Sequence, residues 1–167
     1  MLNGDSVNRI LVQLADRRWT LEATHLACQL ARVLGAEIVF IKMVPVQHIE
    51  WLGTELGYRD FTAEDYENLE DYAATAEDYS VPCSVHRYQY ITFPEGICDV
   101  TEIYGTQLVF AKPIHKIKFI RQIQSRLLRA ALTRQNRQLA DDTLVQAILL
   151  ASCTELAADL HGVKLTL

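Results

Sequence analysis

A cluster of basic side chains marks residues 111–126, which read AKPIHKIKFIRQIQSR. The apolar run Leu108 to Phe110 precedes the cluster and is typical of a short buried strand. In α/β proteins, the turn from such a strand into a helix often binds phosphate through glycines, which let backbone N–H groups approach the anion. This stretch contains no glycine. It gathers cationic side chains instead, namely Lys112, His115, Lys116, Lys118, Arg121 and Arg126.

Three interpretations of the basic cluster remain open. The side chains of Lys112 and His115 would fill the space of a glycine loop and Pro113 has no N–H, so we do not expect the usual backbone cradle. The cluster is then either a solvated start of a helix or an anion site built from side chains. Lysine binds phosphate as a point charge and arginine as a fork. The residues expected in such a site are Lys112, His115, Lys116 and Arg126.

Residue types that perform catalysis occur in no recognisable arrangement. The five histidines have no metal-ligand spacing, and no serine lies in a G-x-S-x-G elbow. The four cysteines show no C-x-x-C spacing, which favours reduced thiols in a cytoplasmic protein over disulfides or a zinc site. We therefore expect a protein without catalytic or metal-ligating residues.

Composition narrows the class of protein further. Half of the 167 residues are hydrophobic and 22% are charged, as in ordinary globular domains, and the net charge is −5. No apolar run approaches the roughly 18 residues that span a bilayer, and the polar start MLNGDSVNR is no signal peptide. We expect no membrane partner. Aromatic residues do not interleave with the basic run, so we expect no sequence-specific nucleic-acid binding either.

Strand and helix patterns alternate along the chain. Apolar, β-branched runs predict strands at residues 10–14, 38–44, 81–90 and 108–111. Helical periodicity predicts helices at 19–34, 63–79, 93–104 and 117–134, and Gly35 ends the first of them. This alternation predicts an α/β fold with a doubly wound, mostly parallel, five-stranded sheet and helices on both faces.

The same periodicity predicts which side of each later helix faces the sheet. For the helices at 63–79, 93–104 and 117–134, the residues expected inward are Tyr66, Leu69, Ala73 and Ala76; Ile97, Val100, Ile103 and Tyr104; and Ile120, Ile123, Leu127 and Ala131.

Charge is distributed unevenly. Residues 50–78 contain ten acidic residues and one arginine, whereas residues 112–137 contain eight of the sixteen lysines and arginines and no acid. We expect the helices that carry these blocks on opposite faces of the sheet, so they cannot neutralise each other within one subunit. The blocks are either two solvated faces, complementary patches between molecules, or a surface for an anionic partner.

Three segments together resemble the universal stress protein family. They are NRILVQLAD at the first strand, LARVLGAEIVFIKMVPV at the first helix and second strand, and EGICDVTEIYGTQLVFAK at the third helix and fourth strand. The resemblance covers about residues 8–133 and implies the Rossmann-like fold of that family. It also implies adenine-nucleotide binding in the members that keep the binding motif, and homodimers that pair through the last strand.

The family's nucleotide-binding motif is degenerate in this chain. The glycines of its G-x-x-G-x₉-G-[ST] pattern fall on Lys112, His115 and Ser125, and the final Ser/Thr falls on Arg126. Its first-strand aspartate falls on Ala15, with Asp16 one position later, and its adenine-contacting valine falls on Val44. The candidate cleft residues are therefore Ala15, Asp16, Val44, Lys112, His115 and Arg126.

Two functions follow from this resemblance. The first is a non-enzymatic regulatory or binding module without a cofactor, which acts as a dimer in a stress response or through a protein partner. The second is a stress protein that binds ATP, AMP or another anion, with at most slow hydrolysis. A looser third reading is a domain of a transporter or kinase system that works alone.

The end of the chain departs from the family pattern. We divide the chain into an α/β domain at 1–135 and a helix–strand extension at 136–167. The extension is either a truncated second repeat or a dimerisation element. Residues 133–144 are polar and poor as a buried strand, whereas 142–161 predict a helix and 163–167 a strand. An unpaired terminal strand is a template for another chain. We expect a homodimer that uses the C-terminal helix or strand.

Overall fold

The computed structural model describes residues 7–54, 61–113, 118–135 and 137–140. Its five strands are β1 (Arg9–Leu14), β2 (Glu37–Pro45), β3 (Cys83–Tyr90), β4 (Leu108–Phe110) and β5 (Gln138–Leu139). They form one sheet in the order β3-β2-β1-β4-β5, and every neighbouring pair is parallel. The helices are α1 (Arg17–Leu34), α2 (Ala63–Asp78), α3 (Phe93–Ile103) and α4 (Lys118–Arg134), with a 3₁₀ turn η1 (Ile49–Trp51). The predicted doubly wound α/β fold is confirmed.

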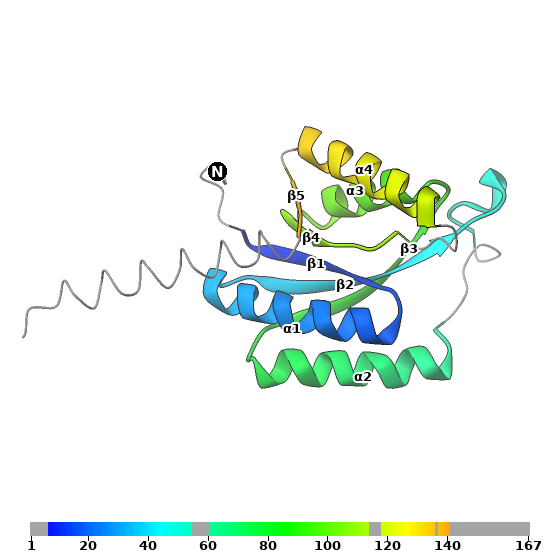
Figure 1. Ribbon diagram of the computed structural model, residues 1–167. Helices are drawn as coiled ribbons and strands as arrows, with labels where there is room; N and C mark the ends of the chain where they lie inside the picture. Colours follow the sequence, from blue (N-terminus) through cyan, green and yellow to red (C-terminus); the bar gives the residue numbers. More distant parts are fainter. Residues whose placement is uncertain (1–6, 55–60, 114–117, 136, 141–167) are drawn as a thin grey trace, which may run out of the picture.

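Helices cover both faces of the sheet (Figure 1): α1 and α2 lie on one face, α3 and α4 on the other. Successive strand residues point to opposite faces, so Ile10 and Val12 pack towards α1 and α2, whereas Leu11 packs towards α3 and α4. Because both faces are covered, β1 and β2 are apolar along nearly their whole length.

The C-terminal end of α1 is as the sequence predicts, whereas its N-terminal end lies two residues earlier, at Arg17 instead of residue 19. Asp16 caps the first turn by accepting a hydrogen bond from the Trp19 N–H at 3.0 Å. Gly35 follows the last turn with a φ of 67°, a left-handed conformation that costs glycine little. The chain therefore turns sharply from α1 into β2.

The inward faces predicted for α2 and α3 are partly wrong. Tyr66 of α2 is 59% exposed and Ala73 is also exposed, whereas Tyr72 is buried and stacks on Phe40, with ring centroids 6.0 Å apart. In α3, Ile103 is exposed although the predicted residues before it are buried. Packing against α1 and the sheet fixes the rotation of α2, and packing against α4 and the sheet fixes that of α3. An apolar residue at the edge of the stripe then remains outside.

The prediction for α4 is wrong at its centre. Ile123 and Leu127 are exposed, whereas Leu128 and Leu132 are completely buried against the sheet and α3. The helix carries two apolar stripes that lie more than a third of a turn apart, and the one next to the sheet and α3 is buried. Periodicity identifies both stripes but does not choose between them.

A short fifth strand lies where the sequence predicts none. The Gln138 N–H donates to the Gln107 carbonyl oxygen at 3.0 Å, and the Ala140 N–H donates to that of Val109 at 2.7 Å. Because β5 lies at the edge of the sheet, its two residues are only half-buried, and a polar side chain is tolerated there. The predicted C-terminal helix and strand lie outside the described residues, and the domain division at residue 135 stays a prediction.

Candidate functional site

The order of the strands reverses between β1 and β4. The chain proceeds from β1 outward to β2 and β3, then returns to β4 on the other side of β1. In such sheets, ligands bind beyond the carboxyl ends of the strands at this switch point. Residues Ala15 and Asp16 follow β1 there, and Ala111 to Pro113 follow β4.

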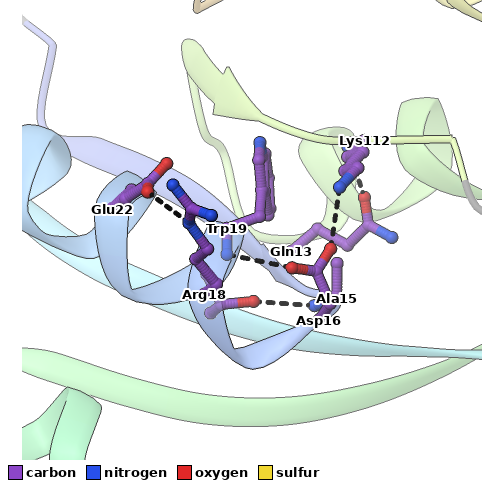
Figure 2. A network of polar contacts seen from close by, with 8 residues as sticks. Gln13, Ala15, Asp16, Arg18, Trp19, Glu22 and Lys112 are labelled. Carbon is purple, nitrogen blue, oxygen red and sulfur yellow. Dashed lines mark hydrogen bonds and ion pairs between the residues drawn. The ribbon is translucent and has the colours of Figure 1, made fainter.

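A buried glutamine joins the two strand ends. Gln13 on β1 is completely buried, and its Oε1 accepts a hydrogen bond from the Lys112 backbone N–H at 2.8 Å (Figure 2). The next residue, Pro113, has no N–H. Neither Lys112 nor Pro113 can therefore offer a backbone donor to an anion, as a glycine-rich phosphate loop would.

The Lys112 side chain lies over the start of α1. Its Nζ donates to Asp16 Oδ2 at 2.7 Å and lies 5.9 Å from the centre of the Trp19 ring (Figure 2). The hydrogen bond from Lys112, together with the one from the Trp19 N–H, holds the pKa of Asp16 below its ordinary value. Both side chains are partly exposed, so we expect this ion pair to contribute little to stability.

Basic residues of α4 complete a groove beside these contacts, which we call the switch-point groove. Its volume is about 510 Å³. It is lined by Trp19, Ala111, Lys112, Pro113, Arg121, Gln122, Ser125, Arg126 and Arg129. Four of these nine residues are cationic and none is acidic. Within the described parts of the chain, no carboxylate pairs with Arg121 or Arg126. Arginine and lysine in such a groove can bind a phosphate or carboxylate group.

The predicted cleft residues are only partly brought together. Lys112 and Arg126 line the groove, and Asp16 adjoins it through its pairing with Lys112. The Ala15 N–H donates to Thr20 Oγ1 at 2.9 Å.

Two of the predicted cleft residues, Val44 and His115, are not among the described residues that line the groove. Val44 is buried in β2, pairs with Gln89 of β3 and is not among the residues that line the groove. His115 lies outside the described residues.

The contributors that were not among the predicted site residues include Gln13, Trp19, Arg121 and Arg129. Arg121 belongs to the basic cluster visible in the sequence, and Arg129 lies two turns further along the same helix. Gln13 offers a weaker signal, a polar residue within an otherwise apolar strand. Trp19 gives none, because its place depends on how α1 meets the loop after β4.

The described residues give no support for a metal site, a membrane-spanning helix or an activated thiol. No cluster of three or more His, Cys, Asp or Glu there could hold a metal ion. No helix among these residues is both long and apolar enough to cross a bilayer. Burial raises the pKa of the Cys28 thiol to about 11, which leaves it a poor nucleophile.

A second hollow, of about 840 Å³, lies at the opposite edge of the sheet. Turn residues at the amino ends of the strands line it, among them Asn8, Gly35 and Gly105. Parallel sheets place their ligands at the carboxyl edge, so the switch-point groove is the stronger candidate.

Comparisons with solved structures identify the fold. A member of the universal stress protein family from Burkholderia pseudomallei matches with a TM-score of 0.58 at 19% identity, over 81% of this chain and 96% of that one. A universal stress protein in complex with cAMP matches with a TM-score of 0.54 at 13% identity, over 81% and 96%. UspA from Lactobacillus plantarum matches with a TM-score of 0.51 at 13% identity, over 82% and 98%.

No protein-family model and no curated protein matches the sequence. The structural neighbours span most of this chain and nearly all of their own length. Their agreement supports the resemblance seen in the sequence: this chain has the fold of the universal stress proteins.

Proposed function

We propose that this protein is a non-enzymatic binding module of the universal stress type that holds a small anionic ligand through side chains. The observation that carries the proposal is the meeting of Lys112, Arg121 and Arg126 in one groove at the switch point. A volume of about 510 Å³ suits a small metabolite. A phosphate group is the ligand chemistry that such cations favour.

The mode of binding differs from a glycine-rich cradle. The Lys112 N–H is already bonded to Gln13, and Pro113 has none to donate. Arginines on α4 instead supply paired N–H donors from the side of the groove. Recognition then depends on charge and on the guanidinium fork.

Binding without catalysis fits the composition of the groove. Among the described residues, its lining contains no histidine, aspartate, glutamate or cysteine that could act as a general base or nucleophile. The bound anion would change the surface that α1 and α4 present to a partner protein. We propose that this change serves a stress response. We place the protein in the cytoplasm, in keeping with the free thiols of Cys28, Cys83 and Cys98.

A second candidate function is the binding of an adenine nucleotide such as AMP or ATP, with at most slow hydrolysis. Trp19 favours it, because its ring lines the groove beside the cations and an aromatic ring can stack on a base. A structural neighbour in complex with cAMP adds support.

Thermal unfolding with inorganic phosphate, AMP and ATP tests both candidates. We expect each anion to raise the Tm, since a ligand at a hundred times its Kd stabilises by about 2.7 kcal/mol. Similar affinities for phosphate and AMP support the anion module, whereas a much tighter AMP complex supports the nucleotide.

Matched variants locate the effect. Arg126→Ala should reduce the ligand-induced shift, whereas Arg134→Ala, a charge change on the same helix outside the groove lining, should not. No shift with any anion at millimolar concentration would contradict both candidates.

The proposal includes a homodimer formed through the strand predicted at residues 163–167. Light scattering should give a dimer mass for the full chain and a monomer mass for a chain that ends at Gly162. Two equal masses would refute this mode of pairing.

A further inference from the structure

Helix α4 carries an apolar row on its outer side. Phe119, Ile123 and Leu127 follow one another at intervals of four residues, so they share one face of the helix. They are 68%, 42% and 56% exposed, whereas Leu128 and Leu132 face the core. Three large apolar side chains in one exposed row are more than the scattered apolar residues of an ordinary surface, and they mark a contact surface.

Two arginines flank this row. Arg126 and Arg134 are exposed, and each lies two turns after a member of the row, Phe119 or Leu127, on the same side of the helix. Neither arginine has an ion-pair partner among the described residues. We call the row and its two arginines the basic face of α4. The matching partner surface is apolar with acidic flanks.

Helix α2 presents a surface of this kind. Tyr66 is 59% exposed, and Ala73 is exposed two turns later on the same side of the helix. Glu70 and Glu77 each follow one of these residues by four positions, so the acids lie beside them. Both glutamates are exposed, and the described part of the chain holds no cation paired with either. We call these four residues the acidic face of α2.

The two faces also match in their dimensions. At about 1.5 Å per residue, Arg126 and Arg134 are about 12 Å apart along α4, and Glu70 and Glu77 are about 10 Å apart along α2. Side chains four residues apart form the ridges by which helices pack on each other, and a small residue such as Ala73 leaves room for such a ridge. One contact between the helices can therefore join the apolar residues and both pairs of charges.

The two faces cannot meet within one chain. Helix α2 packs on one face of the sheet and α4 on the other (Figure 1). Tyr72 and Leu128 point inward from the two helices, so both charged faces point away from the sheet. The complementary partner of each face is therefore the other face on a second copy. A single helix pair buries less surface than the roughly 1,200 Å² of a stable interface, so we expect association only at high protein concentration.

We propose that the basic face of α4 in one chain packs on the acidic face of α2 in a second copy, head to tail. Each added copy leaves one face of each kind open, so the product is a ring or a short row of subunits. The contact requires no ligand in the switch-point groove. It is also separate from the strand pairing of the proposed dimer, so its test depends on neither.

Two full-length variants, each with one face disabled, test this geometry. Leu127→Glu places an acid in the basic face of α4. Glu70→Lys combined with Glu77→Lys reverses both charges of the acidic face of α2. All three side chains are exposed, so we expect both variants to fold, and their Tm values check this.

Matched controls make the same changes outside both faces. Ile103→Glu introduces an acid at an exposed apolar position of α3. Glu22→Lys combined with Glu102→Lys reverses two exposed charges, one on α1 and one on α3. We expect both controls to associate as the wild type does.

Sedimentation velocity at rising protein concentration gives the readout. The wild type should form larger species, and each face variant alone should associate at least about tenfold more weakly. An equimolar mixture of the two face variants should associate again, because each supplies the face that the other lacks. Raising the salt from about 0.1 M to about 1 M should weaken the wild-type association, since the Debye length falls from about 10 Å to about 3 Å.

Three results would overturn the proposal. The first is a wild-type mass that does not change with concentration. The second is a mixture of face variants that sediments as the sum of its components. The third is a loss confined to Leu127→Glu, which would indicate that α4 pairs with α4 of the second copy.

Cross-linking gives a second measurement that leaves the charges intact. One chain would carry Ile123→Cys and another Ala73→Cys, both with Cys83→Ser and Cys153→Ser; the two remaining cysteines are buried. A short bis-maleimide linker should join the two chains in a mixture, and Ile103→Cys in place of Ile123→Cys should give no such product. Linkage between two copies of the Ile123→Cys chain, or equal yields with the control, would contradict the head-to-tail contact.

Discussion

Helices α2 and α4 are both strongly charged, yet they use their charge in opposite ways. Two acids of α2 pair within the fold, Asp65 with Lys42 and Asp71 with Arg17. Arg121 and Arg126 of α4 have no such partner among the described residues and line a groove instead. The charge of α2 helps to anchor the helix, whereas that of α4 remains available to a ligand.

The packing of the two helices shows the same contrast: α2 is fixed within the fold, whereas α4 keeps part of its apolar surface exposed. Tyr72 fixes α2 by stacking on Phe40 of β2, while α4 buries Leu128 and Leu132 and leaves a second apolar stripe exposed. The acidic helix is thus a structural element of one face. The basic helix is attached to the other face and still has two surfaces free for further contacts.

The largest expected effect tests which stripe of α4 is structural. Leu128→Ala should lower the free energy of unfolding by about 3 kcal/mol, because it leaves a cavity in the core between α3, α4 and the sheet. Tyr66→Ala on α2 should cost less than about 1 kcal/mol, since that side chain is largely exposed. Urea denaturation of both variants measures the difference. Equal losses would mean that the rotation of one helix is misassigned.

A smaller effect concerns the paired acid at the start of α2. Burial would raise the pKa of Asp65, but hydrogen bonds from Lys42 and Thr62 outweigh it and lower the pKa from its ordinary 3.8. Asp65 also completes a capping box with Thr62. Asp65→Asn should therefore lower the free energy of unfolding at pH 7 by about 1 kcal/mol.

The pH dependence follows from the direction of that pKa. Because the folded pKa lies below 3.8, the stabilisation by Asp65 is complete well above that pH and is lost as the pH falls through the folded value. Urea midpoints between about pH 6 and pH 3 should fall less steeply in Asp65→Asn than in the wild type. Glu70→Gln, an exposed change on the same helix, should leave the profile as it is. A wild-type profile in Asp65→Asn would contradict the pairing.

The smallest predicted effect lies in the groove. Asp16 competes with any bound anion for the ammonium group of Lys112, and exposed ion pairs are worth about 0.2–1 kcal/mol. Asp16→Asn keeps a good helix cap but removes the competing charge. It should tighten phosphate binding by about twofold to fivefold in isothermal titration calorimetry. Weaker binding in this variant would indicate that Asp16 helps to hold the ligand.

The sequence predicts most of the sheet because four of its five strands carry a local signal of their own. β1 and β2 are mostly apolar, β4 is apolar throughout, and Gly35 marks the end of α1. β5 has no such signal, because two half-buried residues at an edge are held by the backbone of a neighbouring strand. The predictions of the inward faces of α2 and α4 are wrong for a related reason. Several apolar stripes have helical spacing, and tertiary packing decides which of them is buried.

The candidate site, too, could be predicted from the sequence only in part. Lys112 and Arg126 were predicted because a family motif could be laid over the sequence. The bond from Lys112 to Gln13 joins residues 99 positions apart, and no local pattern encodes it. That bond matters most for the mode of binding, because it removes a backbone donor from the groove.

The fluorescence of Trp19 gives the most direct measurement of the central claim, that α4 side chains hold an anion at the switch point. The chain has two tryptophans, so Trp51→Phe leaves Trp19 in the groove as the sole reporter. Titration with phosphate and AMP should give a saturable change in emission that weakens about tenfold or more when Arg126→Ala is added, as expected for loss of a charged hydrogen bond. A flat titration at millimolar anion, or a response that Arg126→Ala leaves intact, would contradict the account.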